Sequence, residues 1–154
     1  MSRWIAPGPL VASIPPAALD QVLRQADWLT CNAREAAALT GEDCPPAAAR
    51  ALAGRLARHG RRDAGVLVRT GPDGCLLDFS ATEPLAVPGF PVTELDSNGA
   101  GDTHTGAFIA ALAAGADAAE AAVRANAAAA ISVTRRGPAT APTATELAQF
   151  LSGA

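Results

Sequence analysis

The segment Asp96-Ser97-Asn98-Gly99-Ala100-Gly101-Asp102 has residue types that could bind and transfer a phosphoryl group. Gly99 and Gly101 let the backbone approach a ligand closely, and the first amides of a following helix form an anion site that the helix dipole reinforces. A carboxylate at Asp102 would repel a phosphate, but it has a use if it accepts the proton of a hydroxyl that attacks the phosphate. Taken alone, the segment favours the structural interpretation, a tight turn followed by an acidic first helical turn.

Three further segments admit both a structural and a chemical interpretation. Thr70-Gly71-Pro72-Asp73-Gly74 is a good hairpin turn that could also wrap nucleotide phosphates with backbone amides. Asn32-Ala33-Arg34-Glu35 fits a helix cap, and a Glu near a phosphate site can also hold Mg²⁺ through water. The segment from Asn126 to Gly137 is an Ala-rich helix and its C-terminal turn, whose free carbonyls could bind a cation.

The elements that must position these segments alternate between strands and helices. Short apolar runs predict strands at 28–31, 65–70, 75–79 and 85–87, with extended residues at 92–95. Helical spacing and capping residues predict helices at 16–26, 32–41, 47–58, 99–114, 117–134 and 143–151. The Pro-rich residues 1–15 are expected to be irregular.

Such an alternation predicts an α/β layered fold with a mainly parallel sheet flanked by helices. Ligands of these folds bind at the carboxyl ends of the strands, next to helix N-termini. The loops after Cys31, Thr70 and Leu95 are therefore expected to lie near one another.

Composition is typical of one soluble globular domain. The 154 residues are 49% hydrophobic and 18% charged, and the net charge of −3 comes without a long basic run, so nothing favours nucleic acid or a membrane as partner. Cys31, Cys44 and Cys75 lack CxxC spacing, and His59 and His104 are far apart. This pattern disfavours a disulfide scaffold or a zinc site and suits a reducing cytoplasm. The N-terminus is not expected to be a signal peptide.

In combination, the four segments resemble the PfkB, or ribokinase-like, family of carbohydrate kinases. DSNGAGD resembles the family signature D-T-x-G-A-G-D, and NAREAAALTG resembles the family's N-x-x-E segment. VLVRTGPDG resembles its strand and glycine phosphate loop, and ANAAAAISVTRRG resembles its late helix and turn. All four occur in the family order, and the resemblance covers residues 5–147. It implies a ribokinase-like layered α/β fold.

The resemblance also implies roles for individual residues, with ATP, Mg²⁺ and K⁺ as cofactors. Asp102 would be the catalytic base. The amides forming the anion hole would be those of Gly99, Ala100 and Gly101. The residues near ATP would be Asn32, Arg69, Thr70, Gly71, Pro72, Asp73, Gly74, Gly101 and Asn126. Glu35 would organise Mg²⁺. The K⁺ ligands would be the Asp96 side chain and the carbonyls of Asn98, Ser132, Arg135 and Gly137.

The sequence departs from the family pattern at several positions. Ser97 replaces Thr, His104 stands where Phe is common, and Ala141 lacks a hydroxyl that some relatives offer to the cation. We expect His104 to be a packed or half-exposed helix residue with no catalytic role. Family members are much longer, so the N-terminal half with the sugar-binding residues and the β-sheet lid is expected to be absent. Residues 1–154 would then be the C-terminal nucleotide-binding and catalytic part of a kinase domain.

The implied function is ATP-dependent phosphorylation of a sugar or nucleoside hydroxyl. The alternative is a truncated or degenerate kinase half that binds nucleotide or a partner without turnover. The expected partners are a small sugar or nucleoside and either a complementing N-terminal half or a second copy of the chain. A Rossmann dehydrogenase is disfavoured because His104 occupies its third glycine position, and a P-loop NTPase is excluded because the chain has no Lys.

Overall fold

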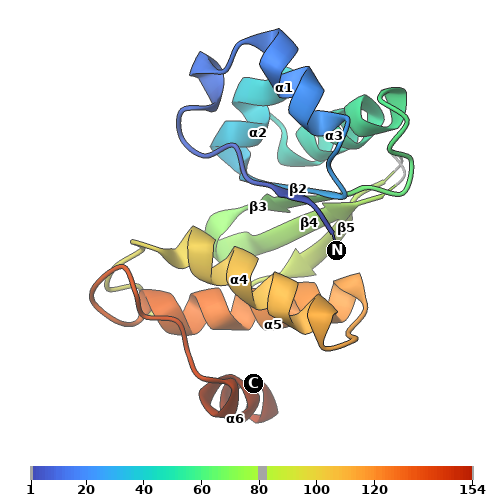
Figure 1. Cartoon of the computed structure of the whole chain (residues 1–154). Helices are drawn as coiled ribbons and strands as arrows, with labels where there is room; N and C mark the ends of the chain where they lie inside the picture. Colours follow the sequence, from blue (N-terminus) through green and yellow to red (C-terminus); the bar gives the residue numbers. More distant parts are fainter. Residues whose placement is uncertain (1, 80–82, 154) are drawn as a thin grey trace. The chain divides into compact units, whose positions relative to one another are not determined.

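The computed structural model describes residues 2–79 and 83–153, which form one five-stranded sheet and six α-helices (Figure 1). The strands lie in sequence order across the sheet: β1 (Trp4–Ile5), β2 (Trp28–Asn32), β3 (Gly65–Arg69), β4 (Gly74–Asp78) and β5 (Leu85–Pro88). The α-helices are α1 (Pro16–Leu23), α2 (Ala33–Thr40), α3 (Pro45–Arg58), α4 (Ala100–Ala113), α5 (Ala118–Val133) and α6 (Ala144–Ser152). Two short 3₁₀ helices are η1 (Val11–Ser13) and η2 (Gly71–Asp73).

The sheet is mixed and mostly parallel, as predicted. β1, β2 and β3 pair in parallel, with Leu29 opposite Val66 and Cys31 opposite Val68. β4 lies next to β3 and follows it after the turn η2, which is the hairpin expected from the glycines of this segment. The expected α/β fold is therefore confirmed.

The chain divides into two compact units. Unit 1 contains residues 1–70 and 76–86, and unit 2 contains residues 71–75 and 87–154. In unit 1, helices α1, α2 and α3 pack around β2 and β3 (Figure 1). The centre of this core is fully buried and aliphatic: Leu23, Leu29, Leu52, Leu56 and Val66. The apolar runs that predicted these strands and helices thus face one another.

Unit 2 is built on the long helices α4 and α5, which lie side by side (Figure 1). α5 is buried along most of its length through small residues such as Ala121, Ala125 and Ala128, as its composition predicted. α6 begins at a capping box of Thr143 and Glu146 and packs on α5. Small side chains let helix backbones approach closely. The packing of α4 and α6 on α5 therefore positions the loops that connect these helices.

One expectation for the strands was wrong. Residues 4 and 5 were expected to be irregular, but they form the edge strand β1. Trp4 stacks on Trp28 with ring centroids 5.2 Å apart, so a tertiary contact holds a strand that is too short to show a periodicity. Residues 92–95, which were expected to be extended, belong to no strand of the sheet, and the amide of Leu95 donates to the carbonyl of Val133.

No helix in the described part of the chain combines the length and the hydropathy that a membrane crossing would require.

Gly65 offers a test of the packing of unit 1. A Cβ added at Gly65 would collide with the ring of Trp28. We expect Gly65→Ala to lower the free energy of unfolding by about 1–3 kcal/mol, because overpacking forces neighbours to shift. Urea unfolding measures the change. The cost should shrink in a Trp28→Leu background, and an equal cost in both backgrounds would show that the ring is not responsible.

Candidate functional site

The loop before α4 has a backbone geometry that requires glycine at its end. Gly99 is the N-cap of α4 and has a left-handed φ of 77°. A Cβ at this position would also collide with the carbonyl oxygen of Pro138. Both features require glycine, so no side chain covers the helix start. The first amides of a helix have no partner within it, although here the amide of Ala100 donates to the carbonyl of Ser97 at 3.2 Å.

Asp102 lies in the first turn of α4 and is exposed. With Gly99, it lines part of a cavity of about 560 Å³ within unit 2. The rest of the cavity wall is mostly small or apolar and comes from α4, α5, the 138–144 segment and Leu147 of α6. A ligand in this space could reach the Asp102 carboxylate, and the role of this carboxylate as a general base stays a prediction.

Asp96 ties the loop before α4 to the turn after α5. Its Oδ1 accepts from the amide of Asn98 at 3.0 Å, and its Oδ2 accepts from the amide of Gly137 at 2.9 Å. The bond from the Gly137 amide and then the bond from the Asn98 amide hold the pKa of Asp96 below its usual value, and the charge of Arg136 adds to the effect. Asp96 therefore stays ionised and anchors a loop that has no sheet pairing.

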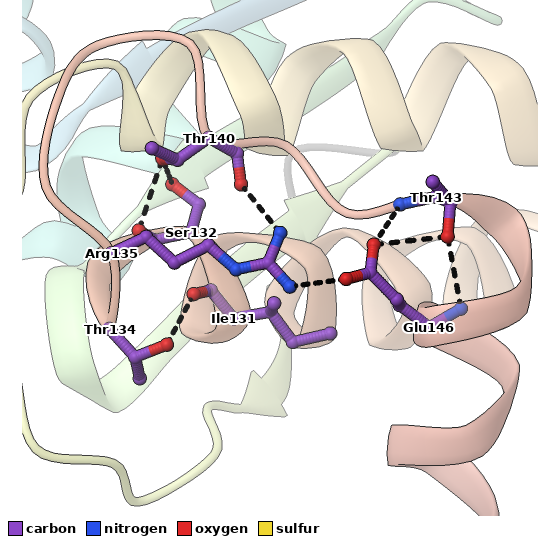
Figure 2. Close-up of polar contacts among 7 residues, drawn as sticks. All are labelled: Ile131, Ser132, Thr134, Arg135, Thr140, Thr143 and Glu146. Atoms are coloured by element: carbon purple, nitrogen blue, oxygen red, sulfur yellow. Dashed lines mark hydrogen bonds and ion pairs between the residues drawn. The ribbon is translucent and has the colours of Figure 1, made fainter.

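The hydroxyl of Thr140 lies among the carbonyl oxygens that were expected to surround a cation (Figure 2). Thr140 Oγ1 is 3.1 Å from the Ser132 carbonyl oxygen and 3.4 Å from the Gly137 carbonyl oxygen. Sequence reasoning noted only that Ala141 lacks a hydroxyl and missed the one at the preceding residue. This group of hard oxygen atoms near an ionised carboxylate fits a K⁺ ion. The roles of the Asn98 and Arg135 carbonyls stay predictions.

Asn126 and His104 form a buried polar pair between α5 and α4. Asn126 Nδ2 donates to the carbonyls of Val87 and Pro88, each at 3.0 Å. Its Oδ1 must therefore accept from His104 Nε2, 2.9 Å away. His104 is packed, as expected. A nucleotide contact for Asn126 stays a prediction, and it would involve an amide that already has protein partners.

The glycine loop of unit 2 is held against the segment after β5. Gly71 and Gly74 have φ values of 69° and 103°. A Cβ at Gly74 would collide with the carbonyl of Val87, and the amide of Gly89 donates to the carbonyl of Asp73 at 3.1 Å. The hairpin interpretation of this segment is confirmed, and the contact of residues 71–74 with ATP phosphates stays a prediction.

Unit 1 holds the remaining predicted residues, Asn32, Glu35, Arg69 and Thr70. Asn32 and Glu35 form a reciprocal capping box at the start of α2, with bonds of 2.8 and 2.9 Å. The Glu35 carboxylate is buried, and Arg69 lies 3.9 Å from it while donating to Thr30 Oγ1 at 2.7 Å. The structural interpretation of this segment is confirmed.

Unit 1 could supply only a small part of the ligands of a Mg²⁺ ion. Mg²⁺ keeps several waters and is commonly bound through one or two carboxylates together with substrate phosphates. Glu35 supplies one carboxylate, and no group of three or more His, Cys, Asp or Glu that could hold a metal occurs among residues 2–79 and 83–153.

The structure thus brings the predicted residues together in two sets. Unit 1 joins Asn32, Glu35 and Arg69, and unit 2 joins the anion-hole loop, Asp102, Asp96 and the turn that ends at Gly137. The approach of the two sets to one another stays a prediction.

Gly99 should tolerate no side chain. We expect Gly99→Ala to lower the free energy of unfolding by more than about 1–2 kcal/mol. The left-handed backbone conformation is unfavourable for Ala, and its Cβ must also displace Pro138. Gly106→Ala is the matched control on the same helix, since its Cβ meets nothing within 4 Å and should add up to about 1 kcal/mol of stability. Thermal unfolding of both variants decides the matter. Equal effects would contradict the requirement at Gly99.

Comparison with known proteins gives consistent results. The chain is 33% identical over 145 residues to the uncharacterised sugar kinase YegV of Escherichia coli strain K12, covering 91% of this chain and 43% of that protein. It is 34% identical over 132 residues to the ATP-dependent ribose-1-phosphate kinase of Halopiger xanaduensis, covering 86% of this chain and 41% of the relative. The chain therefore spans less than half the length of these relatives.

Solved structures share the fold. The ribokinase of Thermotoga maritima matches with a TM-score of 0.80 and 32% identity, over 97% of this chain and 48% of that one. An Escherichia coli protein assigned as a ribokinase II, solved with ATP and Mg²⁺, matches with a TM-score of 0.80 and 34% identity over the same shares, 97% and 48%. The sequence profile described as pfkB family carbohydrate kinase matches residues 7–145. The chain belongs to the pfkB family of carbohydrate kinases and has a ribokinase-like α/β fold.

Proposed function

We propose that this chain is the nucleotide-binding and catalytic part of a kinase that transfers a phosphoryl group from ATP to a sugar or nucleoside hydroxyl. The observation that carries the proposal is the pairing of Asp102 with the Gly99 turn: an exposed carboxylate beside a bare helix N-terminus, at a shared cavity. The names of the relatives, a ribose-1-phosphate kinase among them, and a related structure with ATP and Mg²⁺ support the same reaction class.

In the proposed reaction, Asp102 accepts the proton of the acceptor hydroxyl as its oxygen attacks the γ-phosphorus. The new oxygen–phosphorus bond forms while the bond to the bridging oxygen of ATP breaks, and ADP leaves. The amides of Gly99, Ala100 and Gly101 stabilise the charge on the transferring group, which is the main task in phosphoryl transfer. The Ala100 amide would exchange its bond to Ser97 for one to the phosphate.

Mg²⁺ bound with ATP would supply neutralising charge on the phosphates, with Glu35 holding its water shell. Asn32, Arg69 and the loop from Thr70 to Gly74 would bind and orient the nucleotide. A K⁺ ion held by Asp96 and by the oxygens of Ser132, Gly137 and Thr140 would keep the anion-hole loop in place. Its proposed location is supported by the closeness of the Thr140 hydroxyl to two of these carbonyls.

The second candidate is a kinase half that binds nucleotide or a partner without turnover. It concerns residues 1–154 taken by themselves, which match 43% and 41% of the two relatives. A complementing N-terminal half or a second copy of the chain would then be needed for the acceptor. The two candidates differ in whether sugar-dependent ADP release is ever observed.

We expect the chain alone to bind Mg·ATP weakly and to phosphorylate no sugar. Holding the acceptor hydroxyl in line can be worth about 7–11 kcal/mol, which a base cannot replace when the acceptor is not held. Calorimetry measures ATP binding, and ADP release is followed across pentoses, hexoses and nucleosides. Robust turnover would reveal an acceptor site within this chain, whereas a folded sample without ATP binding would favour the non-enzymatic candidate.

Asp102→Asn should remove catalysis and retain ATP binding. The test uses an enzyme rebuilt by joining this chain to the N-terminal half of a full-length relative. Loss of a general base typically lowers the rate by about 10²–10⁴. The matched control is Asp117→Asn, because Asp117 caps α5 through the amide of Glu120 and Asn caps a helix equally well. Unchanged turnover in the Asp102 variant would refute the proposed role.

A further inference from the structure

The turn between α5 and α6 is closed by the side chain of Arg135 (Figure 2). Arg135 Nη2 donates to Glu146 Oε1 at 2.6 Å, and Nη1 donates to the carbonyl of Thr140 at 3.4 Å. The other carboxylate oxygen of Glu146 accepts from the amide and the hydroxyl of Thr143, at 2.7 and 3.0 Å. Glu146 therefore links the start of α6 to the end of α5, with a separate oxygen for each task.

The same turn lies directly behind the proposed anion hole. The amide of Gly137 holds the Asp96 carboxylate, whose other oxygen holds the amide of Asn98. The carbonyl oxygen of Pro138 lies where a Cβ of Gly99 would be. A shift of residues 137 and 138 would therefore move Asp96 and Gly99 as well.

We propose that the Arg135–Glu146 ion pair is a positioning device for the anion-hole loop. It fixes the turn that carries Gly137 and Pro138, and that turn fixes Asp96 and Gly99. Neither Arg135 nor Glu146 lines the cavity that Gly99 and Asp102 share, so both are positioning residues. The consequence for phosphoryl transfer rests on the proposed function, whereas the mechanical coupling does not.

The surroundings of this pair distinguish it from an ordinary surface ion pair. Exposed pairs generally add little stability. The pair of Arg124 and Glu120 is of that kind, because it joins two residues one turn apart on α5, with side chains 45% and 51% exposed. Arg135 and Glu146 are comparably exposed, at 37% and 43%, but they close a turn and bind its backbone at Thr140 and Thr143. Loss of the Arg135–Glu146 pair, unlike loss of the Arg124–Glu120 pair, is therefore expected to loosen the loop before α4.

The test replaces Glu146 by Gln in the full chain. Gln can still complete a capping box, so the start of α6 is kept while the charge that binds Arg135 is lost. Amide hydrogen exchange is followed by NMR at Asn98 and Gly137, the two amides on the Asp96 carboxylate. We expect both to exchange about two- to fivefold faster, the range for loss of a partly exposed ion pair. Exchange at Val68 in β3 of unit 1 should stay unchanged.

Two controls keep the result interpretable. Glu120→Gln removes the comparison pair and should leave exchange at Asn98 and Gly137 unchanged. Arg135→Met should reproduce the effect of Glu146→Gln, and the double variant should exchange no faster than the faster single variant. Unchanged exchange in both single variants, or an equal rise at Asn98, Gly137 and Val68, would overturn the positioning role.

A binding measurement separates this proposal from the proposed function. Inorganic phosphate is titrated against the unmodified chain while the amide resonances of Gly99 and Gly101 are followed. We expect both resonances to shift, with an affinity about two- to fivefold lower in Glu146→Gln, the same range as for exchange. If phosphate shifts neither glycine amide resonance in the unmodified chain, the proposed anion hole is contradicted. The exchange results would still decide whether the ion pair positions the loop.

Discussion

The carboxylate of Asp96 is the interaction on which the candidate site depends. It receives one amide from its own loop, at Asn98, and one from the turn after α5, at Gly137. The loop between residues 89 and 99 belongs to no strand, so the sheet does not hold it. Hydrogen bonds from N–H groups to an ionised carboxylate are stronger than hydrogen bonds between neutral groups. The lowered pKa of Asp96 keeps this carboxylate ionised at neutral pH. The start of α4 therefore takes its position from this carboxylate.

Close backbone contacts at two glycines also hold the loops of unit 2 in place. Gly99 and Gly74 each lie against a carbonyl that leaves no room for a Cβ, at Pro138 and Val87. Both glycines have positive φ values, so two independent reasons demand glycine at each position. At Gly99, the absence of a side chain also lets a ligand approach the start of α4, as a phosphate would need, whereas Gly74 is buried. Structural necessity and the proposed binding role thus coincide at Gly99.

Structural and chemical interpretations coexist at the other segments too. Asn32 and Glu35 cap α2, and the proposed metal role would give the buried Glu35 carboxylate beside Arg69 a second task. Asn126 is different, because all its amide contacts are to His104 and to the end of β5. Membership of the pfkB family rests on the match over residues 7–145 and is independent of these assignments. The acceptor and the reaction remain proposals because relatives are more than twice as long.

The sequence by itself determined most of the elements and named the candidate catalytic residues, because both depend on local patterns. Asn32 with Glu35 and Thr143 with Glu146 predicted two helix starts, and the glycines at 99 and 101 predicted the turn that begins α4. The anion site at that turn stays a prediction. The tertiary structure decided what joins distant segments. The strand β1, the Thr140 hydroxyl beside Ser132 and the pairing of Arg135 with Glu146 depend on chain packing, and side-chain contacts of this kind leave no periodic signal in sequence.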